Sequence, residues 1–144
     1  MPPRISLDHI ALAVPRLEPA LEALKRVFLA EASPPEEVSG EKVRLSFITV
    51  GGTRIEVLEG TSPESPVSRF LAGGGKGVHH LSFRLEGLDL AAWCRELVAG
   101  GVPVLGGGPR PGAAGQEVIF RTACSSVRRC RFFTYSAMTR GKVP

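Results

Sequence analysis

The residues best able to do chemistry are two histidines that recur in similar surroundings. His9 and His80 each stand near the start of a segment in which apolar residues alternate, at residues 7–14 and 78–85. Such alternation is typical of a β-strand with one buried face. An offset of 71 positions relates the two histidines, and it also relates Leu17 and Leu88, which stand where the two following helical segments begin. The chain therefore contains an internal repeat, which could bring both imidazoles to one place.

A third histidine, His79, is the direct neighbour of His80. Adjacent residues of a strand point to opposite faces, so only one of this pair can share a site with His9. The repeat offset favours His80. Isolated histidines in a chain of this size are more often ordinary, partly buried residues than ligands, and it is the repeat that favours a metal site.

A carboxylate from a later strand would complete such a site. Glu56 lies in the strand-like residues 53–59, where its neighbours Ile55 and Val57 alternate toward the core. Glu59 has the other parity and is the weaker candidate. Two imidazoles and a carboxylate suit Co²⁺, Mn²⁺, Ni²⁺, Fe²⁺ or Zn²⁺ and leave positions open for a substrate. We therefore predict a divalent metal site at His9, Glu56 and His80.

Each half of the chain shows the same order of elements, β-α-β-β-β. The first half has a strand, an amphipathic helix and a hairpin that turns at Gly51 and Gly52, a strong hairpin signal. The expected elements of the first half are residues 7–14, 18–30, 42–50 and 53–58. Those of the second half are residues 78–85, 88–98, 103–105, 117–120 and 131–135, and between the halves a short helix is expected at 67–72.

We expect one α+β domain over residues 1–144, made of two βαβββ modules. The modules span about 5–60 and 77–136, and a short helical linker at 62–75 joins them. Neither module, at about 60 residues, would bury much core by itself. Pairing the two would form a curved, mixed sheet that contains one shared cleft.

Composition narrows the class of protein further. Six of the 18 basic residues lie in residues 121–144, which contain no acidic residue, whereas residues 1–120 contain 12 basic and 14 acidic residues. The positive charge belongs to the tail, so we do not expect nucleic acid as a partner. No apolar run is long enough to span a membrane and no signal segment is visible. The three cysteines form no CxxC pair, and we expect a cytoplasmic protein.

Five segments together resemble the methylmalonyl-CoA epimerase family of the vicinal-oxygen-chelate, or glyoxalase, superfamily. They are DHIALAV at 8–14, VGGTRIEVLE at 50–59, SPESPVSRFL at 62–71, GVHHLSFRL at 77–85 and PRPGAAGQEVIF at 109–120. The resemblance covers about residues 6–120 and implies the fold of the glyoxalase and bleomycin-resistance proteins. It places the family's metal ligands on His9, Glu56 and His80. It also implies a homodimer that acts on an acyl-CoA: metal-dependent epimerisation of methylmalonyl-CoA, with inversion at C2 through a metal-stabilised enolate.

Two positions depart from the family pattern. The fourth family ligand, a Glu on the last strand that also transfers a proton, projects to Phe132, and residues 121–144 contain no acid. The second proton-transfer acid projects near Arg44, with Glu41 close in sequence. Either the original last strand has been replaced, or it persists with an apolar residue at the ligand position. The catalytic groups stay unassigned, and we expect epimerase activity to be weak or absent.

Other polar and glycine residues are candidates for the acyl-CoA entrance. These substrate-binding candidates are Ser65, Arg69, Arg110, Gly112 and Gly115. An ordinary flexible turn accounts for the glycines equally well. For either arginine taken singly, a solvated surface side chain is the more common role. Two other functions compete with the epimerase: another enzyme of the superfamily, glyoxalase-like or dioxygenase-like, and a non-catalytic protein that binds a small molecule in the same cleft.

Overall fold

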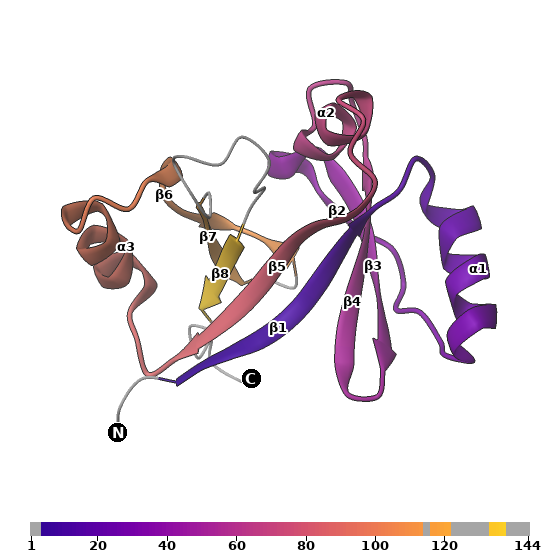
Figure 1. Ribbon diagram of the computed structural model, residues 1–144, viewed down its shortest axis with the longest axis horizontal. Coiled ribbons are helices and arrows are strands. Elements are labelled where there is room, and N and C mark those ends of the chain that lie inside the picture. The colour runs from indigo at the N-terminus through magenta and orange to yellow at the C-terminus, as the bar shows by residue number, and fades with distance from the viewer. Residues whose placement is uncertain (1–3, 114–115, 122–132, 138–144) are drawn as a thin grey trace. The chain divides into compact units, whose positions relative to one another are not determined.

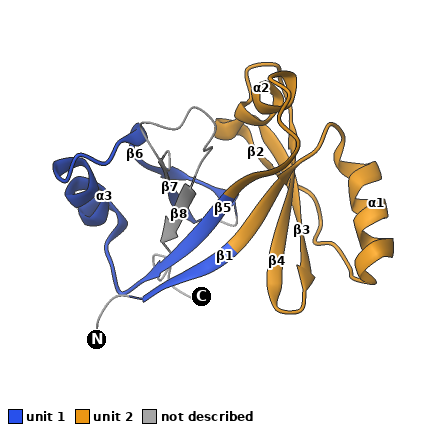
Figure 2. Ribbon diagram, viewed as in Figure 1, with its two compact units in different colours: residues 1–8, 81–144 blue, residues 9–80 orange. Residues whose placement is uncertain are grey.

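The computed structural model describes residues 4–113, 116–121 and 133–137. The chain forms two compact units: unit 2 comprises residues 9–80, and unit 1 comprises residues 1–8 and 81–144 (Figure 2). Strands β1 and β5 each contribute residues to both units, because the unit boundaries fall within them.

The order of elements along the chain is β-α-β-β-β, then a short helix, then β-α-β-β-β again (Figure 1). The elements of the first half are β1 (Arg4–Ala13), α1 (Leu17–Phe28), β2 (Glu36–Val38), the 3₁₀ turn η1 (Ser39–Glu41), β3 (Val43–Val50) and β4 (Thr53–Gly60). Helix α2 (Pro66–Ala72) follows. The elements of the second half are β5 (Gly77–Glu86), α3 (Leu90–Ala99), β6 (Val104–Pro111), β7 (Glu117–Arg121) and β8 (Phe133–Ala137). The predicted α+β architecture of two βαβββ modules is confirmed.

Strand pairing repeats between the halves. In the first half the strands lie in the order β2-β3-β4-β1, and in the second in the order β6-β7-β8-β5. In each half the first strand pairs in parallel with the last, β1 with β4 and β5 with β8, whereas the other pairs within each half are antiparallel. The β3–β4 hairpin turns at Gly51 and Gly52, whose φ angles are 53° and 81°. A tight hairpin needs positive φ at both turn positions, which glycine adopts without steric cost.

Strand β6 is longer than the predicted 103–105. Its residues Gly106, Gly107 and Gly108 have positive φ, and the pairing with β7 shifts register between Leu105 and Arg110. Three successive glycines resemble a turn in sequence, but here they form an irregularity inside a strand. Strand β2 was not predicted either, because three residues are too few for a pattern to show.

The core of unit 2 lies between α1 and one face of its sheet. Leu17 and Leu21 of α1 pack on Ile48 of β3 and Val57 of β4, and all four are buried. Burial of each such side chain contributes about 1.5–3 kcal/mol. The apolar stripe predicted for the helix therefore determines which face of β3 and β4 it covers.

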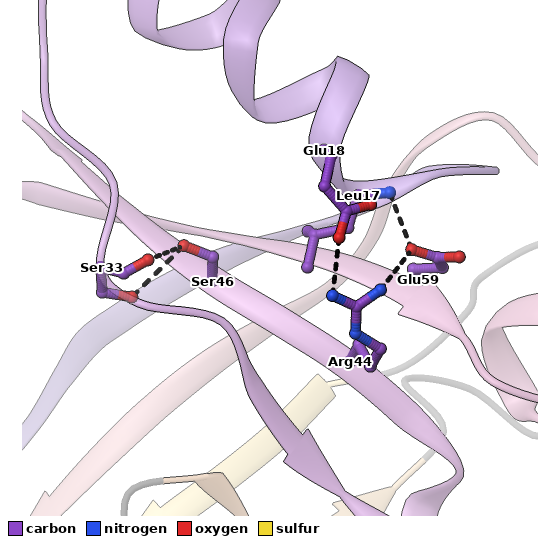
Figure 3. Close-up of polar contacts among 6 residues, drawn as sticks. All are labelled: Leu17, Glu18, Ser33, Arg44, Ser46 and Glu59. Atoms are coloured by element: carbon purple, nitrogen blue, oxygen red, sulfur yellow. Dashed lines mark hydrogen bonds and ion pairs between the residues drawn. The ribbon is translucent and has the colours of Figure 1, made fainter.

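Polar contacts also fix α1 on this face (Figure 3). The carboxylate of Glu59 on β4 accepts a hydrogen bond of 2.8 Å from the Leu17 N–H, one of the unpaired donors of the first helical turn. Arg44 of β3 lies between Glu59, at 3.7 Å, and Glu18 of α1, at 2.6 Å. A negative charge at the N-terminus of a helix is favourable because of the helix dipole.

Ser33 fastens the segment after α1 to β3 (Figure 3). The Ser46 hydroxyl donates to the Ser33 carbonyl at 2.6 Å, and the Ser33 hydroxyl accepts from the Phe47 N–H at 2.9 Å. The Ser33 N–H in turn donates to the Phe47 carbonyl at 2.8 Å. The backbone at Phe47 is therefore held from the edge of the strand.

Unit 1 has a core of its own between α3 and its strands. Leu85, Leu90, Cys94 and Ile119 are buried together. The side chain of Asp89 caps α3 by accepting from the Ala92 N–H at 2.6 Å. Within the same unit, Asp8 is buried and forms an ion pair with Arg84 through two guanidinium nitrogens. None of the described helices combines the length and apolarity required to cross a bilayer.

Candidate metal centre

The candidate site lies on the face of the unit 2 sheet opposite α1. Strand register sets this face: Glu56 on β4 is level with Phe47 on β3 and with Ala11 on β1. Residues that are level on neighbouring strands point to the same side of a sheet. His9, two positions before Ala11, therefore shares this face, whereas Val57 and its partners face α1.

Three predicted ligands meet on this face. The His9 Nε2 lies 3.2 Å from Glu56 Oε2, and the His80 Nε2 lies 3.6 Å from the same oxygen. One donor atom of each residue falls within 4.8 Å of the others. The exposed fractions are 9% for His9, 5% for Glu56 and 6% for His80, so the three polar groups are withdrawn from water.

The surroundings of the triad are apolar. Ala11, Leu45 and Leu58 share the face of Glu56 by register, and all three are buried. In such surroundings charges interact more strongly than in water, and an uncompensated charge is correspondingly costly. A cation would therefore compensate the buried carboxylate of Glu56.

Phe47 holds one side of the site. Its ring meets the His9 ring edge-on, with centroids 5.7 Å apart at 75°. The guanidinium of Arg54, on the same face, lies 4.1 Å from the Phe47 ring centroid in a cation–π contact. Ser33, in the segment after α1, anchors the Phe47 backbone. The orientation of His9 on β1 therefore depends on Phe47 of β3 and, through it, on Ser33.

Burial favours the neutral form of the His80 imidazole. Burial, and then the neighbouring His79 and His9, hold the pKa of His80 well below its usual 6.5. A neutral imidazole keeps a lone pair, which metal binding requires. The rings of His9 and His80 lie 5.6 Å apart at 69°.

This donor set fits a divalent transition metal. An ion bound at about 2.0–2.2 Å by imidazole nitrogen and carboxylate oxygen holds neighbouring donors roughly 3–3.5 Å apart. The two histidine nitrogens lie 3.2 Å and 3.6 Å from the Glu56 oxygen, close to that span. Two nitrogens and one oxygen suit Zn²⁺, Co²⁺, Ni²⁺, Fe²⁺ or Mn²⁺, and the geometry does not select one of them.

Of the residues projected near the second proton-transfer position, Arg44 faces the side of the sheet opposite to the triad. Arg44 is level with Glu59 on the α1 face and is engaged there with Glu18 and Glu59. Glu41 ends the 3₁₀ turn η1, before β3 begins. The β3 positions level with site-facing residues of β4 are Val43, Leu45, Phe47 and Thr49. On β3, therefore, no ionisable side chain faces Glu56.

Backbone register relates the last strands of the two modules. Phe132, where the fourth ligand projects, lies outside the described residues. In the first module Glu56 is level with Ala11, and in the second Thr134 is level with Ser82, which the repeat offset relates to Ala11. Thr134 thus occupies the register position equivalent to Glu56, and residues 133–137 contain no acid.

The substrate-binding candidates fall in both units. In unit 2, Ser65 is fully buried and caps α2 by accepting from the Val67 N–H at 3.2 Å, whereas Arg69 is exposed on that helix. In unit 1, Gly112 lies against Val118, and Arg110 reaches back over Gly106. Gly115 lies outside the described residues. Their role in binding stays a prediction.

One contact was missed from sequence. His79 was expected to face away from the site, but its Nδ1 lies 2.9 Å from the Nδ1 of His80, and both residues are buried. In the sequence, only the adjacency of the two histidines could have indicated this contact. Strand alternation predicts instead that neighbouring side chains point to opposite faces.

Comparisons with known proteins identify the family of the chain. The model of the Glyoxalase/Bleomycin resistance protein/Dioxygenase superfamily matches residues 8–120, a range that includes the whole triad. An ethylmalonyl-CoA/methylmalonyl-CoA epimerase of Cereibacter sphaeroides is 36% identical over 116 residues, covering 79% of this chain and 85% of that protein. The mitochondrial methylmalonyl-CoA epimerase of Dictyostelium discoideum is 30% identical over 115 residues, covering 79% and 68%.

Solved structures show the same fold. A methylmalonyl-CoA epimerase variant of Streptomyces coelicolor, in complex with 2-nitronate-propionyl-CoA, matches with a TM-score of 0.81 and 25% identity. The match covers 96% of this chain and 98% of that one. The chain therefore belongs to the glyoxalase/bleomycin resistance protein/dioxygenase superfamily and, within it, to the methylmalonyl-CoA epimerase family, whose named members are isomerases.

Proposed function

We propose that this chain epimerises methylmalonyl-CoA at C2, with a divalent metal ion held by His9, Glu56 and His80. The observation that carries the proposal is the buried cluster in which both histidine Nε2 atoms lie within 3.6 Å of one Glu56 oxygen. The names of the relatives supply the substrate class, a 2-alkylmalonyl thioester of CoA.

The reaction requires removal of the C2 proton and its return to the opposite face. The electron pair of the broken C–H bond moves toward the thioester carbonyl, where negative charge develops. A divalent cation at the triad would supply Lewis-acid stabilisation of that charge. The apolar surroundings at Ala11, Leu45 and Leu58 exclude water, which strengthens such stabilisation.

Few of the described residues near the triad could transfer the C2 proton. Among the described residues of β3, the positions level with the site carry apolar side chains and one threonine. Glu56 is engaged with the two histidines, and residues 121–144 provide no acid. A missing general acid or base typically lowers a rate by about 10²–10⁴-fold. We therefore expect turnover well below that of a complete epimerase.

The test combines metal binding with exchange at C2. Purified protein should bind one Co²⁺ per chain, measured by elemental analysis after dialysis. Methylmalonyl-CoA in D₂O should lose its C2 proton signal faster with the Co²⁺-loaded protein than with Co²⁺ alone. Removing a residue that merely hydrogen-bonds to a metal ligand typically lowers metal affinity about 10–100-fold. Glu56→Ala removes a ligand itself, so it should weaken Co²⁺ binding at least about 100-fold.

Glu59→Ala is the matched control, since Glu59 is the same residue type three positions along the same strand but faces α1. This variant should keep Co²⁺ affinity and the exchange rate. The proposal would be wrong if the wild-type protein bound no Co²⁺, or if the two variants lost it equally.

A binding-only protein is the second candidate. The apolar face of β3 and the acid-free last segment favour it, because both leave the C2 proton without a partner. It predicts that the protein binds methylmalonyl-CoA but that C2 exchange stays at the rate of Co²⁺ alone. Glyoxalase-like or dioxygenase-like turnover would appear instead with a hemithioacetal, or with a catechol, Fe²⁺ and O₂. The homodimer and the cytoplasmic location rest on resemblance and sequence, and stay predictions.

A further inference from the structure

The two adjacent histidines of β5 are joined through their rings. His79 Nδ1 and His80 Nδ1 lie 2.9 Å apart, a hydrogen-bond distance, and their ring centroids are 5.2 Å apart at 74°. Both residues are 6% exposed. Water is therefore a poor competitor for this contact.

Two nitrogens at this distance share a single proton. If both carried hydrogen the two N–H groups would collide, and if neither did the two lone pairs would repel. Two arrangements are possible: His80 donates from Nδ1 to His79, or His79 donates from Nδ1 to His80. A neutral imidazole carries one proton, so each arrangement also fixes the state of His80 Nε2.

Only one arrangement suits the metal centre. His80 presents Nε2 to Glu56, and a ligating nitrogen must carry a lone pair rather than a proton. We propose that His79 is a positioning residue: it accepts the Nδ1 proton of His80 and so keeps the Nε2 lone pair of His80 directed at Glu56 and His9. This inference rests on the proposed metal centre for its purpose, but the tautomer itself is a property of the metal-free protein.

The alternative tautomer gains little in return. It would place a hydrogen on His80 Nε2, whose distance of 3.6 Å to Glu56 Oε2 exceeds that of a good hydrogen bond. The same oxygen lies closer to His9, at 3.2 Å. Of these two contacts of His80, the one through Nδ1 is the shorter, at 2.9 Å.

Helix α2 holds the His79 ring in place. The Phe70 ring lies perpendicular to it, with centroids 5.1 Å apart at 90°. Gly75 makes room for Phe70, because a Cβ at this position would lie 2.5–2.6 Å from three atoms of the Phe70 ring. Packing therefore fixes the position of the accepting nitrogen of His79. Residues that hydrogen-bond to a metal ligand orient that ligand.

Two substitutions separate hydrogen bonding from packing. His79→Phe keeps an aromatic ring against Phe70 but removes the acceptor. His79→Asn restores an acceptor near the position of Nδ1. Nitrogen-15 NMR of the metal-free protein distinguishes protonated from bare ring nitrogens at His80, and a Co²⁺ titration gives the affinity of each variant.

We expect His80 to be protonated at Nδ1 in the wild type and in His79→Asn, and to lose that single tautomer in His79→Phe. Co²⁺ affinity should fall about 10–100-fold in His79→Phe and largely recover in His79→Asn. A wild-type His80 protonated at Nε2, or equal loss of affinity in both variants, would overturn the proposal. If the wild type bound no Co²⁺ the proposed function would fail, whereas the NMR result would still decide the tautomer.

Discussion

At the scale of single residues, two glutamates of β4 show how position determines role. Glu56 and Glu59 are three residues apart and therefore point to opposite faces of the strand. Glu56 meets two histidines in apolar surroundings, whereas Glu59 accepts the Leu17 N–H and lies near Arg44. Arg44 is engaged on that same face, which is why it cannot be counted with the triad.

His80 gives the metal-free protein a pH dependence. Its folded pKa lies well below the ordinary 6.5, chiefly because burial disfavours the imidazolium. Between these two values the unfolded chain binds a proton that the folded chain does not, so folding stability rises with pH across this window. The Tm of chelator-treated protein should fall as the pH drops below about 6.5.

His80→Asn removes this titrating group and should flatten that fall in Tm. An equal fall in the variant and the wild type would show that other groups cause it. The comparison needs the metal-free state, because a bound cation would add its own pH dependence through competition with protons.

At the scale of elements, helix α2 packs against His79, the neighbour of the candidate ligand His80. Pro66 begins the helix and Ser65 caps it, while Gly60 of β4 lets the helix approach, since a Cβ there would lie 2.1 Å from Ser68 Oγ. The buried Phe70 then reaches His79. This seven-residue helix thus supports a residue that contacts the candidate metal centre.

A double-mutant cycle can test the close packing of the Phe70 ring against Gly75. Gly75→Ala should lower the free energy of unfolding by about 1–3 kcal/mol, because the new methyl group overlaps the Phe70 ring. The cost should shrink in a Phe70→Leu background, where the overlap is relieved. Urea unfolding of the four proteins measures both quantities.

Gly40→Ala is the matched control, because a Cβ at Gly40 has nothing within 4 Å. Its effect should stay within about 0.5 kcal/mol. If Gly75→Ala cost the same in both Phe70 backgrounds, the close approach to the Phe70 ring would not be the cause.

At the scale of the whole molecule, all three candidate ligands belong to unit 2. A cation bound there stabilises the folded state by about 2.7 kcal/mol at a concentration 100 times its Kd. Hydrogen exchange followed by mass spectrometry should therefore show Co²⁺-dependent protection chiefly in peptides from residues 9–80. Peptides from α3 and β6 in unit 1 are the internal reference, and protection confined to them would contradict this placement.

The sequence by itself determined which residues occupy equivalent places in the repeat. Alternation located β1, β4 and β5, and the offset of 71 selected His9 and His80. Parity separated Glu56 from Glu59. These inferences succeeded because strand alternation and repeat spacing are local properties, which a single chain displays without knowledge of pairing.

Only the tertiary structure decided what those residues contact. The place of Arg44 beside α1 depends on the register of β3 against β4 and on the packing of a helix 26 residues away in sequence. The His79–His80 contact depends on Phe70 of α2 and on Gly75, which lies between α2 and β5. Such contacts arise from long-range pairing and packing, which are set by the sum of many weak interactions and leave no pattern at any one position.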